Sequence, residues 1–284
     1  MTDPDRAVDR VFEAVAEVAP HIRERLVERR DDPVETDHPT GDKVIAADAM
    51  AEELLFDRLA NLDGVGELAS EDSDRPVDVG DGVAVSLDPL DGSSNVASNN
   101  LCGTIVGVSD GGLPAAGDTL VGAAYVVYGP ITSMVVAVDD QVTELAVVGG
   151  EVLTLERGVT LPNDPTVYGV GGAPTTWPTD FAAFADELSR ELKLRYGGAM
   201  VGDVNQVLTY GGLFAYPALR DRPEGKLRLQ FEAIPMAYII EAAGGASSNG
   251  ERPLTAIEPA ALHERTPVHL GNRSLIDRLE DALA

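Results

Sequence analysis

Two stretches near the N-terminus repeat apolar residues at helical spacing. In the first 30 residues, one face carries Val8, Val11, Phe12, Val15, Val18 and Ile22. Between residues 42 and 62, the corresponding positions are Val44, Ala47, Ala51, Leu54, Leu55 and Leu59. Residues three and four apart share one face of an α-helix, so both stretches are predicted to be amphipathic helices.

The pattern changes between residue 65 and about residue 155. Short β-rich runs, separated by turns containing Gly and Asp, occupy residues 82–88, 103–109, 120–128, 133–138 and 151–156. Runs of this length and composition are typical of strands, and we expect them to form one sheet.

Beyond a soft boundary near Asn163, helical and strand-like patterns alternate. Helices are predicted at residues 179–192, 233–243 and 274–283, and strands at 193–196, 226–231 and 268–271. The expected organisation is two lobes, residues 1–163 and 164–284. The fold class is mixed α/β (α+β), with helices layered against two sheets.

The 284-residue chain has a formal net charge of -27, from 48 acidic and 21 basic residues. This charge repels nucleic acid and anionic membranes, so neither is an expected partner. The acidic residues are dispersed, and the lysines are Lys43, Lys193 and Lys226. We interpret this composition as halophilic, because concentrated salt screens the self-repulsion. The alternative is an acidic interaction surface.

Cys102 is the single cysteine, which excludes an internal disulfide and a cysteine-based zinc site. The chain shows neither a signal-peptide pattern nor an apolar run of about 20 residues, so a cytoplasmic location is expected. The histidines lie in no nucleophile-triad context and are interpreted as structural or surface residues: His21, His38, His263 and His269. The segment "GVGGAP" is not a dinucleotide-binding fingerprint.

Candidate chemistry begins with "SLDPLDGSSN", residues 86–95, where an apolar run ends in Asp88 and Asp91. Two carboxylates supply the hard oxygen ligands that Mg²⁺ prefers. The small residues that follow expose backbone N–H groups to an anion such as phosphate, and Gly92 allows close approach. The alternative is an ordinary Asx turn.

Two further acidic positions could join this site. Glu71 and Asp72 follow a short apolar run, although on their own they fit a solvated loop. Glu232 lies in an otherwise apolar segment, where a carboxylate is costly unless a metal ion or a salt bridge to Arg228 or Lys226 compensates it. Together these carboxylates could hold two or more Mg²⁺ ions around a phosphoryl group.

The segments "DPLDGSSN", "RYGGAMVGDV" and "GKLRLQFEAIPMAYIIEAAGG" together resemble class I fructose-1,6-bisphosphatases, of a haloarchaeal kind, from about Gly41 to the C-terminus. "DPLDG" alone marks the wider Mg²⁺-dependent, Li⁺-sensitive phosphatase superfamily, which includes inositol monophosphatases. The resemblance implies a layered α-β-α-β-α sandwich of the sugar phosphatase type. It also implies Mg²⁺-dependent hydrolysis of the 1-phosphate of fructose 1,6-bisphosphate, giving fructose 6-phosphate and phosphate in gluconeogenesis.

The resemblance assigns site residues in both lobes. Two or three Mg²⁺ ions, with Mn²⁺ as a substitute, would be held by Glu71, Asp88, the Leu90 carbonyl, Asp91 and Glu232. Asp42 and Asp48 would help to bind metal and activate water, and Asp72 replaces a glutamate that orients the water. The substrate would contact Asp91, Gly92, Ser93, Ser94, Tyr196, Met200, Tyr216, Lys226 and Arg228. Arg195 would reach the site of a neighbouring subunit, which implies a homodimer or homotetramer.

Two departures from the family pattern change the expectations. Gly171 and Pro174 stand where the family has an asparagine and a tyrosine that hold the distal phosphate. Gly82 and Val83 stand where it has a lysine and a tyrosine that bind the inhibitor AMP, so such inhibition is not expected. The weaker distal site leaves open a broad inositol or sugar monophosphatase. Asp72 leaves open a non-catalytic sugar-phosphate-binding protein.

Overall fold

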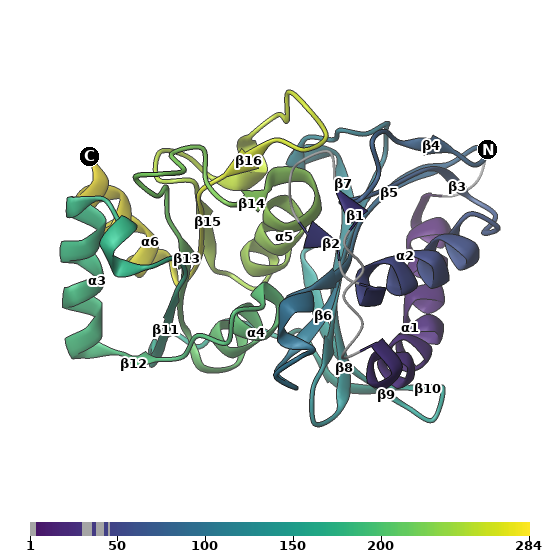
Figure 1. Cartoon of the computed structure of the whole chain (residues 1–284), viewed down its shortest axis with the longest axis horizontal. Coiled ribbons are helices and arrows are strands. Elements are labelled where there is room, and N and C mark those ends of the chain that lie inside the picture. The colour runs from purple at the N-terminus through teal and green to yellow at the C-terminus, as the bar shows by residue number, and fades with distance from the viewer. Residues whose placement is uncertain (1–3, 30–35, 38–42, 45) are drawn as a thin grey trace.

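Five layers of helices and sheets make up the computed structural model, which describes residues 4–29, 36–37, 43–44 and 46–284 (Figure 1). Helices α1 (Pro4–Arg29) and α2 (Ala46–Leu59) cover an eight-stranded sheet. Helices α4 (Met200–Tyr210) and α5 (Ile234–Ala242) separate it from a five-stranded sheet, which α3 (Thr179–Glu191) and α6 (Arg273–Leu283) cover. The predicted α-β-α-β-α layering is confirmed.

The eight-stranded sheet has the order β10-β9-β8-β7-β6-β5-β3-β4. Its strands are β3 (Val65–Ser70), β4 (Val77–Asp78), β5 (Val83–Asp91), β6 (Cys102–Ser109), β7 (Leu120–Tyr128), β8 (Thr132–Val138), β9 (Gln141–Val148) and β10 (Glu151–Arg157). The five runs predicted as strands all belong to this sheet, as expected. The sequence analysis missed β9, because its central residues are only half-buried and the apolar run is broken at Thr143 and Glu144.

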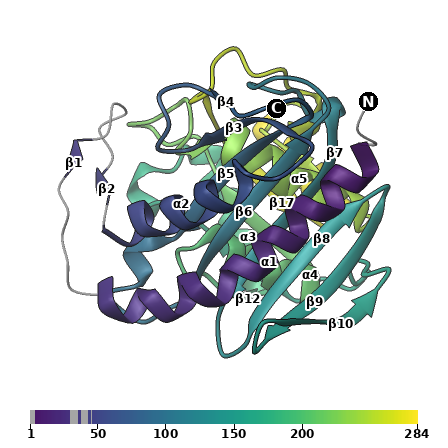
Figure 2. The same ribbon diagram turned by 90° about the vertical axis from the view of Figure 1, so that its right-hand side faces the viewer.

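The predicted N-terminal helices are both present and pack on one face of this sheet (Figure 2). Helix α2 is shorter than predicted. It begins at Ala46, and the preceding residues contribute a two-residue strand, β2 (Lys43–Val44), which pairs with β1 (Thr36–Asp37). The core between α1, α2 and the sheet contains Val11, Val15 and Leu55, which are completely buried.

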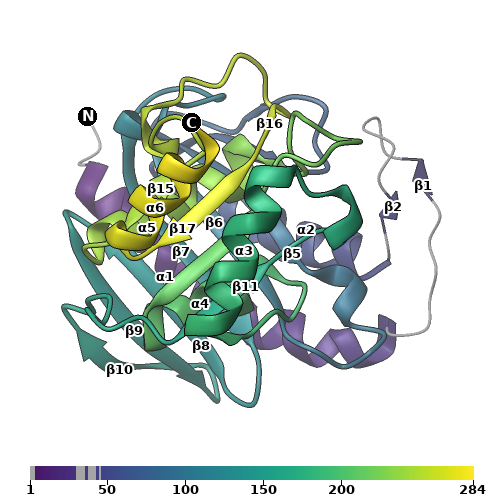
Figure 3. The same cartoon turned by 90° about the vertical axis from the view of Figure 1, so that its left-hand side faces the viewer.

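The five-stranded sheet has the order β12-β11-β13-β17-β15. Its strands are β11 (Val167–Val170), β12 (Lys193–Leu194), β13 (Gly212–Tyr216), β15 (Ala246–Ser248) and β17 (Val268–Gly271). The three helices predicted beyond residue 163 are confirmed, and two of them cover the outer face (Figure 3). Helix α4 was missed because glycines flank and interrupt it. A Cβ atom at Gly202 would lie 3.0 Å from the Leu101 side chain, which is a tight contact.

The prediction of a strand over residues 226–231 was wrong beyond Arg228. Strand β14 (Leu227–Arg228) pairs with β16 (Arg265–Thr266), and a π-helix over Leu229–Ala233 then leads directly into α5. The alternating apolar residues are not facing one core. Leu229 packs in the core between the sheets, whereas Phe231 packs against Ala69 and Leu262 in a separate cluster.

Short 3₁₀ helices occur at Ser93–Asn95, Gly117–Thr119, Pro174–Thr176 and Leu254–Ala256. Within the described ranges, no helix combines the length and the apolar character needed to cross a membrane.

Candidate functional site

Asp88 and Asp91 reach the same side of β5 because the strand is irregular between them. Residues three apart on a regular strand point to opposite faces. Here the register against β6 shifts, so that Asp88 pairs with Ile105 and Asp91 with Gly103, leaving one extra residue on β5. A bulge of this kind redirects side chains, and such bulges are frequent next to active sites.

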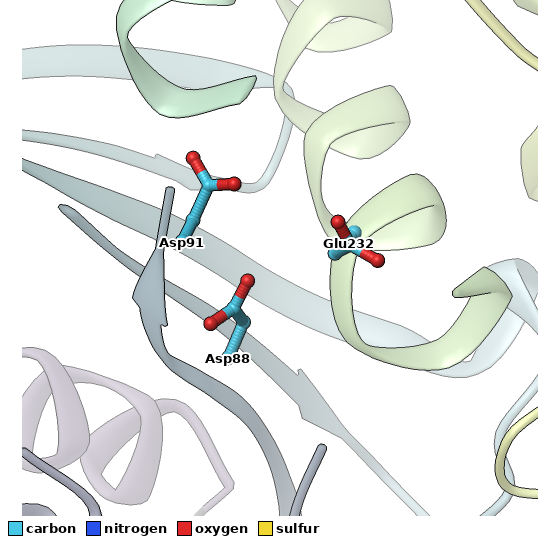
Figure 4. A group of neighbouring side chains, drawn as sticks. All are labelled: Asp88, Asp91 and Glu232. Atoms are coloured by element: carbon cyan, nitrogen blue, oxygen red, sulfur yellow. The ribbon is translucent and has the colours of Figure 1, made fainter. Parts of the chain in front are cut away.

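Glu232 completes a group of three buried carboxylates. One oxygen of each of Asp88, Asp91 and Glu232 lies within 4.8 Å of the others, and the three side chains converge from β5 and the π-helix (Figure 4). The π-turn at Glu232 is held by the Arg228 N–H, which donates a hydrogen bond of 2.6 Å to Glu232 Oε2. Single π-helical turns are rare and occur often at functional sites.

Arg228 joins this group to the loop after β3. Its Nη1 lies 2.5 Å from Glu71 Oε2, and the arginine side chain is 7 % exposed. The sequence analysis left open a salt bridge between Arg228 and Glu232. In the structure the guanidinium bonds to Glu71, and Glu232 receives the backbone N–H of the same residue.

The carboxylates are electrostatically expensive without a cation. Burial raises the pKa of Asp91 to about 7 and that of Glu232 to about 8, and the negative charge of Glu71 adds to both shifts. Burial, Glu71 and Asp91 also raise the pKa of Asp88 well above its usual range. Asp72 follows the same trend, because burial and Glu71 raise its pKa to about 7.

These observations fit a divalent metal site. Oxygen ligands that are buried together and repel one another are stabilised by a hard cation, which neutralises their charge. The donor set consists of carboxylate oxygens, and Leu90 lies in the same cavity wall. The structure therefore supports a metal-binding acidic cluster.

One cavity of about 210 Å³ collects nearly all of the predicted site residues. The predicted residues in its wall are Asp48, Glu71, Asp72, Asp88, Leu90, Asp91, Gly92, Ser93, Ser94, Tyr196, Met200, Tyr216, Lys226, Arg228 and Glu232. Asp42 lies outside the described residues. Arg195 lies outside the cavity wall, with its guanidinium 5.9 Å from the centre of the Tyr210 ring and 3.4 Å from Gln206 Oε1.

The turn at Gly92 brings the two halves of the cavity into contact. Gly92 has φ +72°, and a Cβ atom there would lie 2.3 Å from the Cβ of Ala199, just before α4. Both facts require glycine. The 3₁₀ turn that follows is short and places Ser93 and Ser94 in the cavity wall.

The loop that carries Tyr196 is held from both sides. Asp203 accepts hydrogen bonds from the N–H groups of Gly197 (2.6 Å) and Gly198 (3.2 Å). Asn95 and Asn100 donate to the Gly197 carbonyl at 2.9 and 3.0 Å. Burial raises the pKa of Asp203 to about 6, although the hydrogen bonds from Gly197 and Gly198 oppose this shift.

The sequence analysis missed five residues of the cavity wall: Gly198, Asp203, Phe214, Leu227 and Arg265. Asp203 had a usable signal, because it is a carboxylate in the apolar segment "AMVGDV", as Glu232 is in its own segment. Arg265 had no local signal, because its position depends on the pairing of β16 with β14.

The two departures from the family pattern have structural counterparts. A Cβ atom at Gly171 would lie 2.2 Å from the ring of Tyr216, so this ring occupies the space of a side chain at residue 171. A Cβ atom at Gly82 would lie 1.8 Å from the carbonyl oxygen of Gly64, and Val83 is buried.

Comparisons with known proteins agree with this geometry. Residues 34–153 match the family model described as fructose-1-6-bisphosphatase, N-terminal domain, and residues 161–284 match that of the C-terminal domain. The chain is 51% identical over 282 residues to a class 1 fructose-1,6-bisphosphatase of Halobacterium salinarum, covering 97% of each chain. It is 51% identical over 281 residues to that of Natronomonas pharaonis, covering 98% of this chain and 99% of the relative.

A solved structure shows the same fold. The holo form of Leishmania major fructose-1,6-bisphosphatase superposes with a TM-score of 0.92 at 28% sequence identity, covering 99% of this chain and 95% of that one. The layered fold, the buried acidic cluster, the two domain matches and the 51% identity lead to one conclusion: the chain belongs to the class 1 fructose-1,6-bisphosphatase family.

Proposed function

We propose that this protein hydrolyses the 1-phosphate of fructose 1,6-bisphosphate in a reaction that depends on Mg²⁺ and serves gluconeogenesis. The observation that carries the proposal is the convergence of Asp88, Asp91 and Glu232 at the turn that presents the backbone of residues 92–94. Family membership supports the activity, and the acidic cluster supports the metal dependence.

The metal ligands in this proposal are Glu71, Asp88, the Leu90 carbonyl, Asp91 and Glu232. We assign two or three Mg²⁺ ions to these ligands, with Mn²⁺ as a substitute. Bound divalent cations would withdraw negative charge from the phosphoryl oxygens and favour attack by water. Asp48 begins α2 inside the same cavity wall and would assist this site. Asp42 keeps its assignment on the resemblance alone.

The chain's own residues position the reactants and move the proton. Arg228 and the backbone N–H groups of residues 92–94 hold the phosphate that is cleaved. Water attacks phosphorus, the bond from phosphorus to the sugar oxygen breaks, and the sugar oxygen leaves and gains a proton. Asp72 is assigned as base for the attacking water, because its carboxylate follows Glu71 and lines the same cavity.

The second half of the chain would bind the sugar. We assign most of the metal and phosphate site to a lobe of residues 1–163, and the sugar to a lobe of residues 164–284, from which Arg228 and Glu232 complete the metal and phosphate site. Tyr196, Met200, Tyr216 and Lys226 line the sugar side of the cavity. Arg195 points away from the cavity of its own chain, which supports its assignment to the site of a neighbouring subunit in a homodimer or homotetramer. We retain the cytoplasmic location as a prediction.

The first experiment measures phosphate release in concentrated KCl, with and without Mg²⁺. The substrates are fructose 1,6-bisphosphate, inositol 1-phosphate and fructose 6-phosphate. Mg²⁺-dependent release from the bisphosphate alone is the expected result. Release from all three would move the protein to the broad monophosphatases, which the occupied space at Gly171 favours. Absence of release would favour a non-catalytic binding protein.

A further inference from the structure

Arg265 lies directly opposite Arg228 in the two-stranded ribbon of β14 and β16. Side chains of directly opposed residues in an antiparallel pair project from the same face. Lys226 lies in the bend just before β14. All three cationic side chains line the cavity that holds the acidic cluster.

The two arginines have different hydrogen-bond partners in this cavity. Arg228 bonds to Glu71, beside the acidic cluster. The Nη1 of Arg265 donates a hydrogen bond to the carbonyl oxygen of Lys226. The Nζ of Lys226 lies 5.4 Å from the centre of the Tyr216 ring. The Arg265 guanidinium therefore lies beside the backbone of the residue whose side chain reaches Tyr216.

Two positions that the resemblance places at this end supply no side-chain donor. Gly171 has no side chain to offer a phosphate, and the Tyr216 ring covers its Cα atom. Pro174 begins a 3₁₀ turn and has neither a polar side chain nor an N–H group. A phosphate dianion buried in a cavity wall requires compensating charge, and a guanidinium provides it with paired, directional hydrogen bonds.

We propose that Arg265 is a substrate-binding residue that holds, together with Lys226, the phosphate that is not cleaved. The inference rests on the proposed function, because it assumes a substrate with phosphates at both ends. It assigns to β16 the recognition that separates a bisphosphate from a monophosphate. It rests on three observations: the register that opposes Arg265 to Arg228, the hydrogen bond from Arg265 to the Lys226 carbonyl, and the Tyr216 ring that fills the space at Gly171.

The test uses fructose 6-phosphate, which carries only the phosphate in question, in EDTA so that no metal-dependent hydrolysis occurs during the measurement. Calorimetry measures its Kd for the unmodified protein and for Arg265→Gln, Arg265→Lys and the control Arg157→Gln, on the remote strand β10. We expect Arg265→Gln to weaken binding about tenfold or more, as loss of a charged hydrogen bond does. Arg265→Lys, which keeps the charge but not the fork, should be intermediate, and Arg157→Gln should match the unmodified protein.

A kinetic arm separates this role from contact with the cleaved phosphate. The KM for fructose 1-phosphate, which lacks the second phosphate, should be the same in Arg265→Gln and the unmodified protein, whereas the KM for the bisphosphate rises. An equal rise for both substrates, or an unchanged Kd for fructose 6-phosphate, would overturn the proposal. If the unmodified protein released no phosphate from the bisphosphate, the proposed function would be contradicted instead. The calorimetric result would still decide the role of Arg265.

Discussion

The backbone N–H of Val201 donates a hydrogen bond of 2.7 Å to Asp91 Oδ2, across 110 residues of sequence. Val201 is the second residue of α4, where N–H groups have no partner within the helix. Asp91 closes β5 and belongs to the acidic cluster. One carboxylate thus accepts a hydrogen bond from the first turn of a helix in the second half of the chain and also belongs to the acidic cluster. The geometry of the cluster depends on how the two halves pack.

Asp88→Asn should make the metal-free protein more stable and abolish phosphate release. Burial raises the pKa of Asp88, so the folded state binds its proton more tightly than the unfolded state does. Stability from this group is therefore lost as pH rises, and at pH 8 the ionised carboxylate opposes folding. An uncharged amide removes that cost. Activity should fall by on the order of 10³-fold, because ligand loss removes several kcal/mol of charge stabilisation.

Thermal unfolding at pH 8, in EDTA and then with Mg²⁺, measures the effect. The Tm in EDTA should rise by about 2–4 °C for each kcal/mol that the substitution adds to the free energy of unfolding. The increase in Tm that Mg²⁺ causes in the unmodified protein should be absent from the variant. Asp221→Asn, in an exposed loop, is the control and should behave like the unmodified protein. If Mg²⁺ raised the Tm of Asp88→Asn as much as that of the unmodified protein, Asp88 would not be a metal ligand.

Asp203→Ala should raise KM more than it lowers kcat. The carboxylate binds the N–H groups of Gly197 and Gly198, and these residues follow Tyr196 in the cavity wall. Loss of both bonds frees the loop that presents Tyr196, so we expect a KM about tenfold higher for the bisphosphate. Asp203→Asn keeps one acceptor oxygen and should recover part of the loss. Steady-state kinetics on the two variants would contradict this role if kcat alone fell.

Gly171→Ala should weaken sugar binding by displacing Tyr216. The added Cβ atom would lie 2.2 Å from the Tyr216 ring, which is 9% exposed, so the ring has to move. We expect a KM for fructose 1,6-bisphosphate raised by about tenfold, with Mg²⁺ dependence unchanged, because the acidic cluster is untouched. Gly149→Ala, where a Cβ atom meets open space, is the comparison for added backbone strain. Unchanged KM in Gly171→Ala would remove Tyr216 from the site.

His269→Leu should flatten the loss of stability in acid. His269 is buried in β17 and stacks on Phe181, and burial lowers its pKa from 6.5 to about 3. Between these pH values the unfolded chain binds a proton that the folded chain does not. This group therefore lowers stability by about 1.4 kcal/mol for each pH unit below 6.5. Leucine does not titrate, so this contribution disappears.

Urea unfolding at pH 4.5, 5.5 and 6.5 checks the slope for His269→Leu, with the exposed His21→Gln as the control. The difference between His269→Leu and the unmodified protein should grow in favour of the variant as pH falls. Parallel pH curves for the two would show that His269 is protonated in the folded state.

Arg195→Ala tests whether this arginine acts in the site of a neighbouring subunit. Its guanidinium lies over Tyr210, outside the cavity of its own chain. Because we assign it to substrate binding in a neighbouring subunit, the variant should show a raised KM for fructose 1,6-bisphosphate. Mixing it with Asp88→Asn under conditions that exchange subunits should restore a fraction with normal KM. In such hybrids, the inactive subunit supplies Arg195 to an intact acidic cluster. Absence of any recovery on exchange would contradict the assignment.

Local patterns in the sequence determined much of this protein. Helical spacing predicted α1, α2, α3, α5 and α6, since a helix that packs on one side must repeat apolar residues at its own period. The segment around Asp88 and the isolated charge of Glu232 predicted the acidic cluster, because buried carboxylates are too costly to keep without compensation. The acidic composition likewise indicated life in salt, as the haloarchaeal relatives do.

The tertiary structure alone decided what depends on register and packing. The bulge that turns Asp88 and Asp91 to one side arises from pairing with β6, and the π-turn at Glu232 arises between two separate cores. Arg265 faces Arg228 only because β16 pairs with β14 in one register. A shift of one residue in any such pairing would send these side chains to the other face. The periodicity of a segment encodes its local structure, whereas contacts between distant segments are set by how the whole chain packs.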